Sequence, residues 1–81
     1  MEELEAQREH LVALANTRMP FGKYSGRLLL DLPEPYLAWF ARQGFPRGQL
    51  GRLLETALEV KTNGLESLVR PLQAGVSRRT R

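Results

Sequence analysis

The sequence predicts an α+β fold, in which an N-terminal helix, a β-hairpin, two further helices and a short C-terminal helical turn share one core. Two observations lead to this expectation. Residues 2–16 and 50–61 repeat apolar side chains at helical spacing, whereas residues 18–30 lose the helical period. Because a lone two-stranded hairpin is unstable in water, the predicted hairpin must pack against the helices.

The first helix is expected over residues 2–16, where the glutamates gather near the positive end of the helix dipole. Its apolar stripe consists of Leu4, Leu11, Leu14 and Ala15. Asn16 favours a helix boundary, and Pro20 prevents the helix from continuing.

The hairpin is expected where two short apolar runs, residues 18–21 and 27–30, flank Gly22-Lys23-Tyr24-Ser25-Gly26. Two glycines around three polar or amphipathic residues are typical of a hairpin loop, because glycine accepts the positive φ angles that such loops need. Pro20 has no amide hydrogen for a β-ladder, so its strand should lie at an edge.

The next helix is expected to begin after residues 31–35 and to end at Gly44. Asp31 is the expected cap, and Pro33 or Pro35 suits the first helical turn. The face with helical spacing consists of Tyr36, Leu37, Phe40 and Ala41. We expect the core to hold most of the aromatic side chains, namely Phe21, Tyr36, Trp39 and Phe40. The alternative is that Tyr36 or Trp39, which point away from Leu37, reaches the surface and marks a partner site.

The clearest helical pattern belongs to residues 50–61, with Asn63-Gly64 as its stop signal and further turns over residues 65–70. Its repeating positions are Leu50, Leu53, Leu54, Ala57, Leu58 and the stem of Lys61. We therefore expect one domain over residues 1–72, followed by a basic, disordered tail over residues 73–81.

Composition argues against enzyme chemistry. The 81 residues include no cysteine and one histidine, His10, so disulfides, zinc sites with sulfur ligands and thiol catalysis are excluded. No catalytic triad or metal-ligand set can be assembled, and we expect no cofactor, no metal and no small-molecule substrate. The chain also lacks a signal peptide and a membrane-spanning apolar run, which predicts a cytoplasmic protein.

Charge is distributed unevenly along the chain, whose net charge is +3. Residues 2–9 are acidic, whereas residues 18–52 carry six basic side chains against Asp31 and Glu34, a local balance of +4. Such a separation creates a local attractive potential for polyanions although the total charge is modest.

A series of short motifs resembles a family of small uncharacterised bacterial proteins catalogued as putative quorum-sensing-regulated virulence factors. The motifs lie within residues 18–66 and are Met19-Pro20-Phe21-Gly22-Lys23-Tyr24-Ser25-Gly26-Arg27, Asp31-Leu32-Pro33, Tyr36-Leu37-Ala38-Trp39-Phe40, Gly44-Phe45-Pro46, Gly48-Gln49-Leu50-Gly51 and Asn63-Gly64-Leu65-Glu66. The Phe-Gly-Lys-Tyr-x-Gly element also resembles one in the C-terminal accessory region of exodeoxyribonuclease X-like exonucleases. Because nothing here matches the acidic nuclease core, that resemblance implies an accessory role without cleavage.

We hypothesise that this non-enzymatic domain contacts nucleic acid, DNA or RNA, through the basic hairpin. Lys23 and Arg27 would meet phosphates while Tyr24 stacks on an unpaired base. Further cations that would extend the surface are Arg18, Arg42, Arg47 and Arg52. A solvated loop would also explain these residues. The alternative function is a protein-interaction module, homo-oligomeric or with another partner, using the apolar stripe of residues 50–61.

Overall fold

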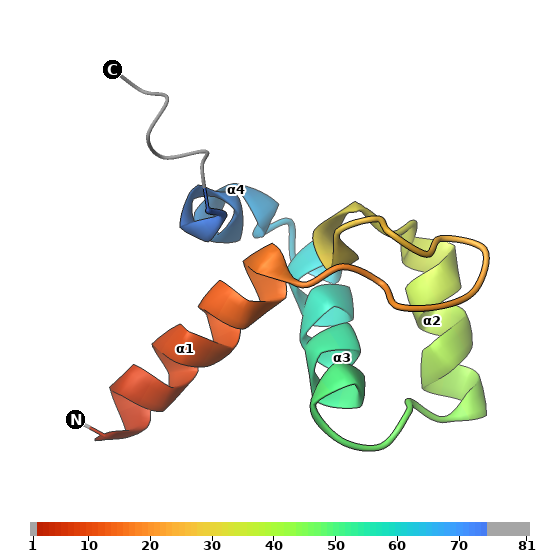
Figure 1. Ribbon diagram of the computed structural model, residues 1–81, viewed down its shortest axis with the longest axis horizontal. Helices are drawn as coiled ribbons and strands as arrows, with labels where there is room; N and C mark the ends of the chain where they lie inside the picture. The colour runs from red at the N-terminus through yellow and green to blue at the C-terminus, as the bar shows by residue number, and fades with distance from the viewer. Residues whose placement is uncertain (1, 75–81) are drawn as a thin grey trace.

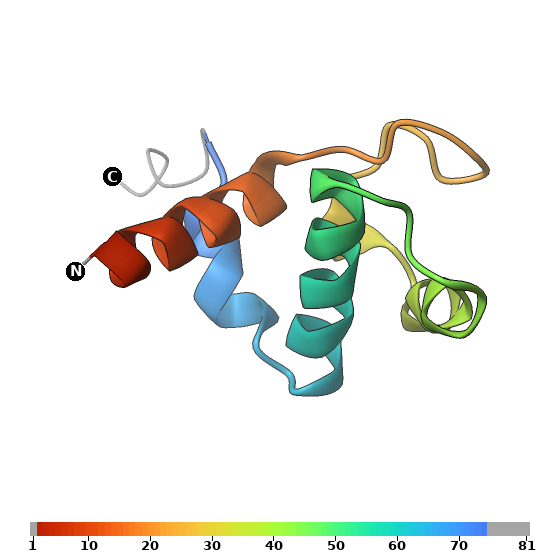
Figure 2. The ribbon, with the colours of Figure 1, turned by 90° about the horizontal axis from the view of Figure 1, so that it is seen from below.

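The computed structural model describes residues 2–74, and the elements of this part of the chain are helices and 3-10 turns (Figure 1). Its elements, in chain order, are α1 (Glu2–Asn16), the 3-10 turn η1 (Leu29–Asp31), α2 (Glu34–Gln43), α3 (Gln49–Thr62), α4 (Glu66–Val69) and the 3-10 turn η2 (Arg70–Leu72). Helix α3 stands in the centre, with α2 on one side and α1 and α4 on the other (Figures 1 and 2).

The prediction of an α+β fold is wrong, because residues 2–74 contain no strand. The pairing expected of a hairpin is reduced to one isolated antiparallel bridge between Arg18 and Leu28. The run of leucines explains the difference. Leu29 and Leu30 are both buried, whereas neighbouring residues on a strand point to opposite faces. A 3-10 turn places both side chains in the core between α1 and α3, so the second predicted strand becomes η1.

The reversal of the chain at Gly22–Gly26 is nevertheless present. The amide of Met19 donates to the carbonyl of Arg27 at 2.8 Å, and the amide of Gly26 donates to the carbonyl of Met19 at 2.8 Å. Gly22 and Gly26 have φ angles of +80° and +89°, which side chains with a Cβ rarely adopt. We call residues 20–27 the basic loop.

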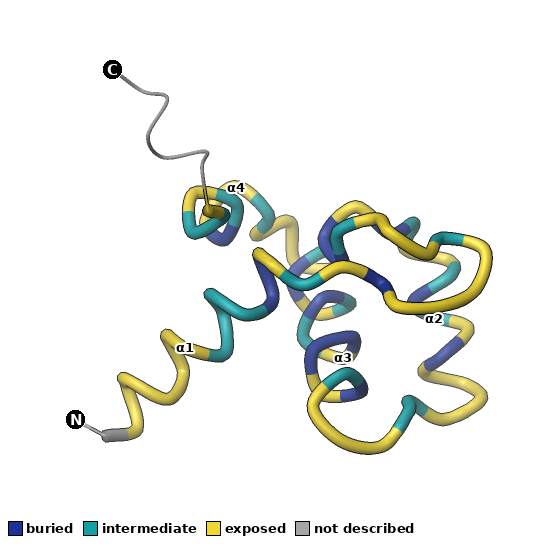
Figure 3. Tube along the Cα trace, in the orientation of Figure 1, coloured by how far each residue is buried: buried dark blue, intermediate teal, exposed yellow. Residues whose placement is uncertain are grey.

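Helix α1 has the predicted bounds but only part of the predicted burial. Leu14 and Ala15 are buried and Leu11 is half-buried, whereas Leu4 is 67% exposed. The beginning of α1 therefore projects beyond the core (Figures 1 and 3). At the other end, Asn16 donates to the carbonyl of Leu72 at 3.1 Å and accepts from the amide of Ala74 at 2.6 Å.

Helix α2 ends as predicted but begins differently. Gly44, with φ +107°, closes the helix by donating its amide to the Phe40 carbonyl at 2.7 Å. Pro33 occupies the N-cap position, so the expectation that Asp31 caps this helix is wrong. Asp31 instead forms an ion pair with Arg70 at 3.0 Å, which links η1 to η2.

Helix α3 forms the middle of the core, as its pattern predicted. Its buried side chains are those of Leu53, Leu54, Ala57 and Val60, while Leu50 and Leu58 are half-buried. Helices α1 and α2 and the turn η1 pack against α3. The use of its apolar stripe for protein interaction stays a prediction. Gly51 is buried because the α2–α3 linker crosses it: a Cβ here would lie 1.7 Å from the Pro46 carbonyl oxygen.

The C-terminal part follows the sequence prediction as far as residue 72, whereas Gln73 and Ala74, which the prediction assigned to the tail, donate hydrogen bonds to Arg70 and Asn16. Gly64, with φ +66°, lies in the turn that follows the end of α3. Helix α4 and the 3-10 turn η2 supply the expected further turns. Most of the predicted tail, residues 75–81, lies outside the described residues. Among the helices that are described, none has the length and apolar character needed to cross a membrane.

Candidate nucleic-acid interface

The basic loop is attached to the first turn of α2 through two tyrosines. The ring of Tyr24 meets the ring of Tyr36 edge to face, with centroids 4.7 Å apart and planes inclined at 64°. A Cβ on Gly22 would lie 3.3 Å from the Tyr36 hydroxyl oxygen, so glycine at this position lets the loop approach α2. Figure 1 shows the loop lying over the upper part of α2.

The structure brings together Lys23 and Arg27, the two cations that the sequence analysis assigned to phosphate contacts. The Lys23 ammonium lies 5.4 Å and the Arg27 guanidinium 5.5 Å from the centroid of the Tyr24 ring, within the range of cation–π attraction. Arg18 joins them, because its Nη1 donates to the Gly26 carbonyl at 2.7 Å and braces the end of the loop. All three basic residues are exposed.

Tyr24 itself is poorly placed for the stacking role that the sequence suggested. Its side chain is half-buried, and its ring already contacts Tyr36 and two cations. The large aromatic side chains that reach solvent are Phe21, 47% exposed, and Trp39, 46% exposed. The expectation that Phe21 and Trp39 lie in the core is therefore wrong.

Phe40, 8% exposed, takes the core position on α2 instead. Five rings in contact form what we call the aromatic row: Tyr24 contacts Tyr36, Tyr36 contacts Phe40, and Phe40 contacts both Trp39 and Phe45. Helical spacing in the sequence left either Tyr36 or Trp39 able to reach the surface, and the packing of α2 exposes Trp39.

Arg42 and Arg47 lie at the opposite end of α2 from the basic loop. Arg42 is in the last turn of α2 and Arg47 is in the linker that follows; both are exposed. Since α2 has 10 residues, its two ends are about 15 Å apart along the axis. Six of the seven predicted site residues therefore form two groups, with Trp39 between them. The seventh, Arg52, is exposed on α3.

The acidic residues of this region are engaged elsewhere. Asp31 pairs with Arg70 at 3.0 Å, and the Glu34 carboxylate accepts a hydrogen bond from the Thr62 hydroxyl at 3.3 Å. Asp31 and Glu34 are the only carboxylates between residues 18 and 52 of the sequence. The positive balance of this segment is therefore not cancelled by an acidic side chain paired with the basic loop.

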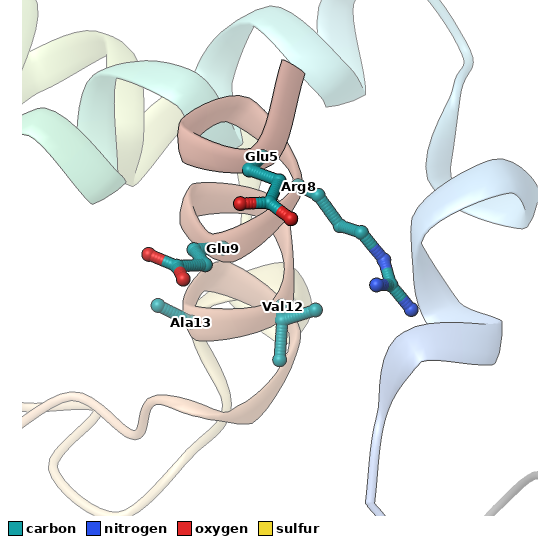
Figure 4. Close-up of a pocket in the computed structure, with 5 residues that line it drawn as sticks. All are labelled: Glu5, Arg8, Glu9, Val12 and Ala13. Carbon is teal, nitrogen blue, oxygen red and sulfur yellow. The ribbon is translucent and has the colours of Figure 1, made fainter. Parts of the chain in front are cut away.

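A second surface feature, an open hollow of about 390 Å³, lies along α1. It is lined by Glu5, Arg8, Glu9, Val12 and Ala13, and Figure 4 shows Arg8 extending away from the two carboxylates toward the C-terminal helical segments. Its mixed charges favour no particular ligand. No group of three or more potential metal ligands occurs within residues 2–74.

His10 has a partner that the sequence did not reveal. Its Nε2 lies 2.8 Å from the Thr56 Oγ1 on α3, and the Thr56 hydroxyl also donates to the Arg52 carbonyl at 3.0 Å. Because a hydroxyl has one proton, Thr56 donates to Arg52 and accepts from His10. His10 therefore has a structural hydrogen bond between α1 and α3.

Comparisons with known proteins identify the family of this chain. The model of a family described as "putative quorum-sensing-regulated virulence factor" matches residues 7–72. The uncharacterized protein YpeB of Escherichia coli K12 is 57% identical over 68 residues, which cover 83% of this chain and 94% of YpeB. YpeB of Escherichia coli O157:H7 matches with the same identity and coverage. No solved structure matches the chain.

The chain therefore belongs to the family described as "putative quorum-sensing-regulated virulence factor", and its relative YpeB is itself uncharacterised. The family resemblance seen in the motifs is confirmed, and the match also includes residues 7–16 of α1, which lay outside those motifs. The likeness of the Phe-Gly-Lys-Tyr-x-Gly element to exonuclease accessory regions stays a prediction.

Proposed function

We propose that this protein is a non-enzymatic nucleic-acid-binding domain whose basic loop contacts the phosphate backbone. The observation that carries the proposal is the grouping of Arg18, Lys23 and Arg27 around Tyr24 and the end of the loop. Phosphate contacts by lysine and arginine supply most of the affinity in non-specific nucleic-acid binding. The basic loop offers such cations on a rigid support.

Two further features support this function. The loop is fixed to α2 by the Tyr24–Tyr36 contact, so its cations lose little freedom on binding. In addition, the charge of Asp31 is offset by Arg70 outside the basic loop. Glu34, which a hydrogen bond from the neutral Thr62 hydroxyl does not neutralise, is then the one remaining carboxylate charge among residues 18–52.

The test is a fluorescence anisotropy titration of labelled DNA and RNA, single- and double-stranded, at several salt concentrations. If about four phosphates are engaged, the logarithm of affinity should fall with the logarithm of salt at a slope of about −3.6 for a duplex and about −2.8 for a single strand. The Lys23→Gln/Arg27→Gln variant should bind more weakly, with a slope shallower by about 2.

A charge-compensated control separates the loop from the net charge. Adding Glu3→Gln and Glu5→Gln to the double variant restores the net charge through exposed residues at the start of α1. The loop hypothesis predicts that binding stays weak in this quadruple variant. Absence of binding to all four nucleic acids at low salt, or full recovery in the quadruple variant, would contradict the proposal.

A second candidate function is self-association through α4. Leu65 and Leu68 are 41% and 69% exposed and lie three residues apart, so they present one small apolar patch. We rank this function second, because a stable interface usually buries about 800 Å² per partner, far more than two leucines supply. Light scattering over a range of concentrations should show a dimer that Leu68→Ser abolishes if this function is correct.

A further inference from the structure

We infer that the preferred ligand is single-stranded nucleic acid, and that Trp39 is the residue on which an unpaired base stacks. This inference rests on the proposed function and adds to it the ligand class and a binding residue. It starts from the arrangement of cations and exposed aromatic surface along α2.

Trp39 presents a ring to solvent from a well-supported position. It is 46% exposed, and the covered part of its ring packs edge to face on Phe40 at a centroid distance of 5.2 Å. Phe40 in turn contacts Tyr36 at 5.2 Å, which ties Trp39 to the same aromatic row as the basic loop. An aromatic side chain fixed in this way loses little freedom when a base stacks on it.

The charged groups lie on both sides of Trp39 along the helix axis. Tyr36, which holds Tyr24 with its cations Lys23 and Arg27, is three residues before Trp39, and Arg42 is three residues after it. Residues three apart are neighbours on a helix surface, so the loop cations, the Trp39 ring and the Arg42 guanidinium follow one another along α2. Figure 3 shows that the loop and much of the outer side of α2 are exposed.

This arrangement fits a single strand better than a duplex. Proteins that bind single strands combine a positively charged track for the backbone with aromatic rings for the bases. In a duplex the bases are stacked on each other, so Trp39 would have no base face to contact. Phe21, 47% exposed within the basic loop, offers a second ring of the same kind.

The experiment uses Trp39 as its own reporter, since it is the one tryptophan of the chain. The full-length protein is titrated with an oligothymidylate of about 15 nucleotides, which forms no duplex, and with a duplex of the same length. We expect tighter binding of the single strand, with quenching of the Trp39 emission by the single strand and unchanged emission with the duplex.

Variants then separate stacking from other causes. Trp39→Ala should weaken single-strand binding about 5- to 150-fold and leave duplex binding within about twofold, whereas Trp39→Phe should lose less. Leu4→Ala removes an exposed apolar side chain at the start of α1, away from the basic loop and α2, and should change neither. Because the emission of the unaltered protein is read as well, the test does not depend on the stability of the variants.

Unchanged Trp39 emission at saturating oligothymidylate, or equal affinity for strand and duplex, would overturn the inference. The proposed function would survive that result if binding remained sensitive to Lys23→Gln/Arg27→Gln. If neither nucleic acid binds, the proposed function fails first and the inference falls with it.

Discussion

Tyr24 and Tyr36 join two segments that are otherwise separated by the turn η1: their ring centroids are 4.7 Å apart, and the contact attaches the basic loop to α2. Tyr36 also packs edge to face on Phe40 at 5.2 Å, and both tyrosines pack against the buried core, so their rings connect the loop to it. Stability and binding are therefore linked at this contact.

The first prediction concerns the strength of that contact. Tyr24→Ala and Tyr36→Ala should each destabilise the protein, and a double-mutant cycle should give a coupling free energy of about 0.5–1.5 kcal/mol, as for other aromatic pairs. Urea denaturation monitored by circular dichroism measures it. Tyr24→Phe keeps the ring and should cost little. A coupling free energy near zero would show that the loop is held by its backbone hydrogen bonds alone.

The second prediction concerns Gly51. Alanine normally favours a helix by about 1 kcal/mol over glycine, but here its Cβ would meet the Pro46 carbonyl oxygen at 1.7 Å, and a backbone atom cannot move aside easily. Gly51→Ala should therefore lower stability by about 1–3 kcal/mol, with a melting temperature reduced by about 4–8 °C for each kcal/mol. Gln49→Ala, an exposed change in the same helical turn, should stay within about 0.5 kcal/mol. A Gly51→Ala protein as stable as the parent would disprove this close approach of the linker.

The third prediction compares the two partners of the ion pair between η1 and η2. Asp31→Asn should cost about 0.2–1 kcal/mol, because the pair is about 40% exposed, with side-chain exposures of 39% and 44%, and is screened by solvent. Arg70→Ala should cost more, since Arg70 Nη2 also donates to the Leu30 carbonyl at 3.2 Å. Chemical denaturation of both variants at low and high salt tests this order. If both variants lose the same stability, and high salt removes both differences from the parent protein, the hydrogen bond to Leu30 contributes nothing to stability.

The fourth prediction concerns which ring nitrogen of neutral His10 carries the proton. Since Thr56 accepts from Nε2, neutral His10 should carry its proton on Nε2, which nitrogen-15 chemical shifts of the ring can identify. Thr56→Val removes the acceptor and should lower stability by about 0.5–1.5 kcal/mol. Detection of the proton on Nδ1 would contradict the assignment of donor and acceptor.

The helices could be predicted from the sequence because their signals are local. The apolar spacing over residues 50–61 and the stop signal at Asn63-Gly64 lie inside or next to the helix that they predict. The observed bounds of α3, Gln49–Thr62, agree closely with them. The family motifs were equally local, and they led to the correct family.

The features that sequence reasoning missed depend on contacts between distant residues. Three consecutive leucines, residues 28–30, suit a strand or a 3-10 turn, and burial against both α1 and α3 decides for the turn. Likewise, Trp39 and Phe40 are neighbours of similar character, and only the packing of α2 determines which one is buried. Thr56, the partner of His10, is 46 residues away, and no pattern in the sequence around His10 indicates it.

For the candidate site, the sequence identified the loop cations but misplaced the aromatic surface. Lys23, Arg27 and Arg18 come together because they are near in sequence and the chain reverses between them. Arg42 and Arg47 are separated from the basic loop by the length of α2. A count of charges along the sequence contains no information about this distance.

The side chain of Asn16 has a consequence for how the protein folds. Its amide links the end of α1 to Leu72 and Ala74, which are 56 and 58 residues further along the chain. These bonds can close only after the intervening helices have taken their places, so we expect them to form late and to break early. Amide hydrogen exchange at Ala74 would then report the first opening of the molecule, well before its centre unravels.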